Sequence, residues 1–149
     1  MKIISNKKNI SKKDLLTIRI VLDRSGSMQG SQEITIDALN TYLNELKQEN
    51  SNNTSLTLST FDSMSIDIPI SRVLVSKLNS FPADILQPRG GTPLFDAIGL
   101  AIHDLENIKE STDDNKVLVI VTDGLENASK EYTFEKTFIK AKAGRPNAK

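Results

Sequence analysis

The segment from Val21 to Met28 places one carboxylate and two hydroxyl groups at alternate positions, directly after an apolar run. These groups belong to Asp23, Ser25 and Ser27. In an extended segment alternate side chains point the same way, so the three oxygens can face one point. Gly26 lets the loop turn closely around that point. Side-chain oxygens gathered in this way are suited to binding a hard cation.

Two segments far along the chain offer oxygen ligands of the same kind. Thr92, after Gly90 and Gly91, supplies a third hydroxyl, and Asp123 supplies a second carboxylate after the apolar run 117–121. Mg²⁺ prefers oxygen ligands in near-octahedral geometry at about 2.0–2.1 Å and usually keeps several waters. Three hydroxyls and two carboxylates suit Mg²⁺, with Mn²⁺ as the alternative. The chain has no Cys and one His, which disfavours a zinc or soft-metal site.

These three motifs, in this order, resemble the metal-ion-dependent adhesion site of von Willebrand factor type A domains, over roughly residues 17–140. The resemblance implies that the metal ligands are Asp23, Ser25, Ser27, Thr92 and Asp123. It also implies an electrophilic ion, because the hydroxyls carry no charge and the aspartates often act through water. Such an ion takes an Asp or Glu of a partner protein as its final ligand. We therefore expect a divalent-cation-dependent protein–protein interaction module and not an enzyme.

Side chains that adjoin the three motifs are expected at the rim of this site, where they would set the choice of partner. They are Arg24, Met28, Gln29, Arg89, Glu126 and Asn127. The two arginines would favour an acidic epitope, although the central part of the chain is net negative.

Strand patterns that alternate with helix patterns predict an α/β fold. The sheet should be doubly wound and mostly parallel, with one antiparallel edge strand, as in a Rossmann-like type A domain. Strands are predicted at residues 15–22, 56–61, 66–70 and 117–121. Pro69 places the third strand at the antiparallel edge, because proline cannot donate to a ladder. Five consecutive apolar residues predict that the fourth strand is covered on both faces.

Apolar residues at helical spacing predict two long helices, one at residues 32–49 and one from Pro93 to about Lys109. Ser31 and Thr92 are the candidate N-caps. A short helix is expected at 73–78 and a last amphipathic helix at 133–143. In this arrangement the three motifs converge on the carboxyl edge of the sheet, where ligands bind in such folds.

The carboxyl end of the chain is shorter than the resemblance implies, since type A domains usually add two strands and a helix after the segment matching 133–143. The resemblance implies a strand order that runs from 66–70 through 56–61 and 15–22 to 117–121. This order leaves strand 117–121 with one neighbour, and natural proteins normally cover an apolar edge. Three explanations would account for the short carboxyl end and the open edge. They are truncation, a strand added by a partner or second copy, and a helix folded over the edge. We favour pairing at the 117–121 edge.

A length of 149 residues suits one domain. We assign residues 15–143 to the type A-like domain, 1–14 to a basic segment and 144–149 to a tail. Residues 20–135 hold eight Lys and Arg against eighteen Asp and Glu, a net charge of −10, which disfavours nucleic acid as a partner. No apolar run approaches the ~20 residues of a membrane span. The lack of Cys and of a secretory h-region favours a cytoplasmic protein.

Two other functions were weighed. A magnesium-dependent phosphohydrolase of the haloacid dehalogenase type also places an Asp after the first strand, but it requires a second Asp where this chain has Ser25. It also requires an acidic cluster after a later strand, where Glu126 and Asn127 are a poor match. The remaining alternative is a scaffold domain without metal.

Overall fold

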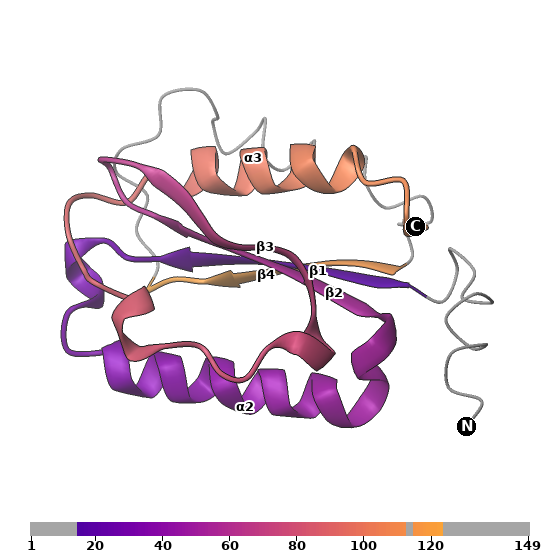
Figure 1. Cartoon of the computed structure of the whole chain (residues 1–149). Helices are drawn as coiled ribbons and strands as arrows, with labels where there is room; N and C mark the ends of the chain where they lie inside the picture. Colours follow the sequence, from indigo (N-terminus) through magenta and orange to yellow (C-terminus); the bar gives the residue numbers. More distant parts are fainter. Residues whose placement is uncertain (1–14, 113–114, 124–149) are drawn as a thin grey trace, which may run out of the picture.

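The computed structural model describes residues 15–112 and 115–123. In this part of the chain, one sheet lies between two long helices (Figure 1). The strands are β1 (Leu16–Asp23), β2 (Thr54–Phe61), β3 (Ile66–Leu74) and β4 (Lys116–Val121). The long helices are α2 (Gln32–Asn50) and α3 (Leu94–Glu106). Short 3₁₀ helices are η1 (Gly26–Met28), η2 (Ser51–Asn53), η3 (Val75–Lys77) and η4 (Ala83–Ile85).

The strand order is β3-β2-β1-β4. β1 pairs in parallel with β2 and with β4, whereas β2 and β3 are antiparallel. This confirms the predicted α/β fold, the strand order and the antiparallel edge. Asp23 lies opposite Phe61 of β2, and Leu22 lies opposite Val121 of β4. The parallel register therefore brings the carboxyl ends of β1, β2 and β4 to one edge, the left end of the sheet in Figure 1.

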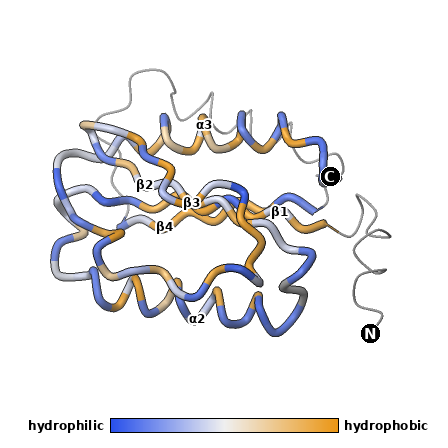
Figure 2. The backbone as a smooth tube through the Cα atoms, viewed as in Figure 1, coloured by the Kyte–Doolittle hydropathy of each residue, from blue (hydrophilic) through white to orange (hydrophobic). Residues whose placement is uncertain are grey.

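Alternation along β1 builds a core on each face of the sheet. Ile18, Ile20 and Leu22 are buried together with α2 side chains, in a cluster that also takes residues from β2. On the other face, Val21 packs with Phe61 and with alanines of α3. Figure 2 shows hydrophobic positions concentrated in the strands between the helices. Asp23 follows on the same side of β1 as Val21, so the strand period delivers its carboxylate to the edge facing the start of α3.

The helix bounds agree with the sequence prediction for α2 and differ for α3. Pro93, and not Thr92, is the N-cap residue of α3, and the helix ends at Glu106 rather than near Lys109. The end comes early because Asn107 closes the last turn, with its N–H donating to the carbonyls of His103 and Asp104. No helix in residues 15–112 and 115–123 is long and apolar enough to cross a membrane.

The short helix expected at 73–78 is present only as the 3₁₀ helix η3, because β3 extends to Leu74. Val73 and Leu74 pair with Leu56 and Ser55 of β2, and only the η3 turn follows. The β2–β3 pairing is irregular near Arg72, which has a φ of 53° and donates its N–H to Thr57 Oγ1. This irregularity is a bulge that bends the edge strand.

β4 is less covered than its apolar sequence predicts. Val119 and Val121 pack against the core on the α2 side, but Val117 and Ile120 are 37% and 41% exposed. Leu118 packs against the core on the α3 side, so each face of this strand is covered only in part. The last predicted helix, at 133–143, lies outside the described residues.

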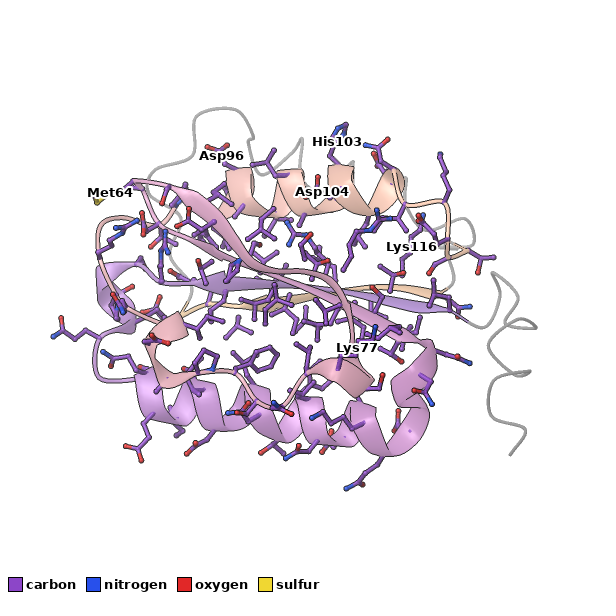
Figure 3. The ribbon with its side chains drawn as sticks, viewed as in Figure 1. Met64, Lys77, Asp96, His103, Asp104 and Lys116 are labelled. Atoms are coloured by element: carbon purple, nitrogen blue, oxygen red, sulfur yellow. The ribbon has the colours of Figure 1, made fainter. Side chains whose placement is uncertain are left out.

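A buried cation interrupts the apolar run of β1. The side chain of Arg19 is 4% exposed, and its Nη2 donates to Asp104 Oδ2 of α3 at 3.0 Å. Figure 3 labels Asp104 on α3, the helix that covers this face of the sheet. The Nε and Nη1 atoms of Arg19 find no hydrogen-bond partner among the described residues. Burial lowers the pKa of Arg19, and the charge and hydrogen bond of Asp104 oppose that shift.

Candidate metal centre

Asp23 is the last residue of β1, and two hydrogen bonds orient its buried carboxylate. Oδ1 accepts the N–H of Ser25 at 2.7 Å, and Oδ2 accepts the hydroxyl of Thr122 at 2.7 Å. The first bond folds the chain back after the strand, as in an Asx turn. The second joins the ends of β1 and β4. The carboxylate is therefore held in place by the segments that follow β1 and β4.

Hydrogen bonds link three of the other predicted ligands to this carboxylate, first through the backbone N–H of Ser25 and then through its hydroxyl. Ser25 Oγ lies 3.0 Å from Ser27 Oγ, and Ser27 Oγ donates to Asp123 Oδ1 at 3.0 Å. Asp23 and Ser25 are buried, whereas Ser27 and Asp123 are exposed. One end of this set of ligands is thus buried, and the other is open to a ligand from outside.

Thr92 reaches the same edge from the loop before α3. Its side chain is buried, and the loop is joined to η1 by a 2.9 Å bond from the Gly26 N–H to the Gly90 carbonyl. Hydroxyl and carboxylate oxygens of this kind suit Mg²⁺ or Mn²⁺. The described part of the chain has no group of three acidic, His or Cys side chains that could hold a metal ion. The candidate ligands are a different kind of set, because only two of the five are carboxylates. The donor set fits a hard divalent cation.

Arg24 and Arg89, expected at the rim, are both engaged by one buried carboxylate. The Nε atoms of the two arginines donate to Asp62 Oδ2 at 2.6 and 2.7 Å. Arg24 also pairs with Asp67, and Nη2 of each arginine donates to Ser65 Oγ. Their charges are therefore largely compensated within the molecule.

The other rim residues divide between core, surface and the undescribed part. Met28 is buried in the core cluster on the α2 side, and Gln29 is exposed. Glu126 and Asn127 lie outside the described residues. Met28 turns inward because η1 presents its last side chain to the core. Of the six rim residues, Gln29 is the one the structure shows as a free surface neighbour of the ligand loop.

Two residues of this edge escaped the sequence analysis. Thr122 holds Asp23, and Asp62 holds the two arginines. A signal for Asp62 was present in the sequence, because it directly follows strand β2. Asp23 likewise ends β1, and Asp123 comes two residues after β4.

The Asp62 carboxyl has a strongly shifted pKa. Burial alone would raise it, but hydrogen bonds from Arg89, the Met64 N–H, Arg24 and the Ser65 N–H lower it from 3.8 to about 2. A lowered pKa in the folded state adds stability at neutral pH, which is lost as pH falls from about 4 towards 2. The shift corresponds to about 2 kcal/mol.

We therefore predict that Asp62→Asn makes the free energy of unfolding less dependent on pH under acidic conditions. Between pH 6 and pH 3, the wild-type free energy of unfolding should fall by roughly 1 kcal/mol more than that of the variant, because only the wild type must protonate this carboxyl. Urea unfolding at a series of pH values measures the difference. Parallel curves for the two proteins would contradict the assignment.

Solved structures with the same fold include two pilus proteins and a protein of the mussel byssus. The vWF domain of the type V pili tip protein Mfa5 from Porphyromonas gingivalis aligns with a TM-score of 0.62 and 17% identity, covering 83% of this chain and 43% of that one. A mutant of the PilB minor pilin from Streptococcus sanguinis aligns at 0.58 and 17%, covering 78% and 31%. Proximal thread matrix protein 1 from the mussel byssus aligns at 0.58 and 15%, covering 89% and 36%. The chain spans less than half the length of each, and at these identities the likeness shows the fold alone.

Family models give a direct assignment. A search of curated proteins finds no match. The model of the von Willebrand factor type A domain matches residues 18–126, which include all five predicted metal ligands and most of the chain. With this match, the strand order and the oxygen-lined carboxyl edge, the chain belongs to the von Willebrand factor type A domain family.

Proposed function

We propose that this domain is a divalent-cation-dependent protein-interaction module. Asp23, Ser25, Ser27, Thr92 and Asp123 would hold Mg²⁺ or Mn²⁺, and an Asp or Glu of the partner would complete its coordination. The observation that supports this most strongly is the series of hydrogen bonds that joins buried Asp23, through the N–H and hydroxyl of Ser25, to exposed Ser27 and Asp123. A cation there is anchored on one side and accessible on the other.

The charge of the ligands favours an acidic visitor. Three of the five are neutral hydroxyls, so a divalent cation held by two carboxylates keeps its affinity for a further anionic oxygen. Arg24 and Arg89 contribute less to this attraction than their sequence positions predict, because Asp62 and Asp67 neutralise them. The attraction for a partner carboxylate would therefore come from the ion itself.

The surface around the ion that contacts the partner would be small and would include both polar and apolar side chains. Gln29 and Ser27 are exposed beside the site, and Met64 is 70% exposed at the tip of the β2–β3 turn (Figure 3). A cytoplasmic setting and pairing of a further strand with β4 remain predictions of the sequence. Nothing in the geometry favours phosphate hydrolysis, since the position two residues after Asp23 is Ser25, whose hydroxyl contacts Ser27.

A capture experiment tests the proposal. The immobilised domain should retain its partner from a lysate in millimolar Mg²⁺ and release it in EDTA. Thr92→Ala should abolish retention, because the ion loses a ligand. Ser59→Ala is the matched control, since it also removes a buried hydroxyl but from the middle of β2. Retention that is equal in Mg²⁺ and EDTA, or equally lost in both variants, would contradict a metal-mediated contact.

A further inference from the structure

Three loops meet at the candidate metal centre, and backbone hydrogen bonds join them. The ligand loop of residues 23–28 contacts the β2–β3 turn through the Arg24 N–H, which donates to the Phe61 carbonyl at 2.9 Å. It contacts the loop of residues 89–92 twice. The Arg89 N–H donates to the Arg24 carbonyl at 2.8 Å, and the Gly26 N–H donates to the Gly90 carbonyl at 2.9 Å.

The turn and the third loop are also joined directly. The Ser63 N–H donates to the Gly91 carbonyl at 3.1 Å, and the Gly91 N–H donates to Ser63 Oγ at 2.7 Å. The contact leaves no room for a side chain at Gly90, where a Cβ would lie 2.5 Å from Ser63 Oγ and φ is +66°. Glycine is thus required at Gly90 by both conformation and space.

Asp62 lies where these loops meet, and its side chain is 0% exposed. Oδ1 accepts the N–H groups of Met64 and Ser65 at 2.7 and 3.0 Å, which shapes its own turn. Oδ2 accepts Nε of Arg24 and Nε of Arg89 at 2.6 and 2.7 Å, which draws in the other two loops. Both oxygens are therefore committed to hydrogen bonds within the protein, and the carboxylate is not placed to bind the ion itself.

We propose that Asp62 is a positioning residue of the metal site, which holds the two ligand loops in register through Arg24 and Arg89. The inference rests on the proposed function, because its consequence is metal affinity. Arg24 lies between the ligands Asp23 and Ser25, and Arg89 lies three residues before Thr92. Fixing these two backbones brings hydroxyls from separate loops to one point before the ion arrives.

The expected consequence is a cost in affinity without the loss of any ligand. If Asp62 no longer draws the arginines together, the ion must order both loops as it binds, and that ordering opposes binding. Residues that orient metal ligands typically change affinity by about 10- to 100-fold when replaced. We expect a loss of that size for Asp62→Asn, which keeps the shape of the side chain but removes its charge.

Asp104→Asn is the matched control, because it weakens the other buried ion pair, with Arg19, away from the ligand loops. Titration calorimetry with MgCl₂ and with MnCl₂, at a temperature where all three proteins are folded, should show weaker binding for Asp62→Asn and unchanged affinity for Asp104→Asn. Amide hydrogen exchange without metal gives a second readout. Exchange at Gly26, Ser63 and Gly91 should accelerate in Asp62→Asn and stay unchanged in Asp104→Asn.

The outcomes separate this inference from the proposed function. A wild-type protein that binds neither ion overturns the proposed function, and with it the link between Asp62 and metal affinity. Wild-type binding with equal affinity in Asp62→Asn overturns the role of Asp62 alone. Equal losses of affinity, or equal acceleration of exchange, in the two variants would mean that general destabilisation and not loop positioning is responsible.

Discussion

Asp23→Ala is expected to abolish the stabilisation of this domain by Mg²⁺. Ligand that binds only the folded state raises the free energy of unfolding, by about 2.7 kcal/mol when free ligand exceeds the dissociation constant 100-fold. Asp23 is a buried member of the proposed ligand set, and its carboxylate also accepts the Ser25 N–H. Removing it should therefore eliminate the metal response.

Thermal unfolding with 5 mM MgCl₂ or with EDTA measures this effect. The wild type should melt several degrees higher in Mg²⁺, and Asp23→Ala should melt at the same temperature in both. Asp37→Ala, which removes an exposed carboxylate from α2, should keep the full response. The same Mg²⁺-dependent rise in wild type and Asp23→Ala would refute the metal site.

The buried pair of Arg19 and Asp104 should respond with opposite signs when each partner is replaced. Asp104→Ala leaves a buried guanidinium without its counter-charge, and we expect a loss of about 2–4 kcal/mol. Arg19→Met instead removes a cation with two unpartnered nitrogens and fills the space with an apolar chain. Asp104, which is 49% exposed, can then be solvated, so Arg19→Met should be stabilising by about 1–2 kcal/mol.

Urea unfolding at pH 7 of the two variants and of the double variant tests this prediction. In the double variant no buried charge remains, so its stability should lie near that of Arg19→Met and well above that of Asp104→Ala. If both single variants were destabilised to the same extent, the ion pair would be a net source of stability, contrary to this argument.

Local pattern was sufficient to predict most of the fold. Apolar runs at 15–22 and 117–121 and the alternation at 56–61 and 66–70 each became a strand, and Pro69 identified the antiparallel edge. These predictions succeed because the strand period decides which side chains can be buried. Where the pattern was weak, at 73–78, pairing with β2 extends the strand to Leu74 and leaves only the short helix η3.

The candidate ligands were also visible locally, but their surroundings were not. The spacing of Asp23, Ser25 and Ser27 is a property of a few adjacent residues, whereas the partner of Arg24 lies 38 positions away and that of Arg19 lies 85 away. The sequence analysis assigned Arg24 to partner recognition because nothing in its neighbourhood showed that Asp62 would neutralise it.

The sequence by itself thus determined the strands and the kinds of oxygen that reach the carboxyl edge, since both follow from patterns within single elements, and the family resemblance supplied the strand order. Only the tertiary structure decided that Met28 turns inward, that Asp62 binds both arginines, and that Arg19 is buried against α3. The physical reason is that a charged side chain is attracted by whatever opposite charge packing brings within hydrogen-bonding reach. The distance between the two charges depends on how loops and layers that are remote in the sequence pack together. It does not depend on the residues next to the charged side chain in the sequence.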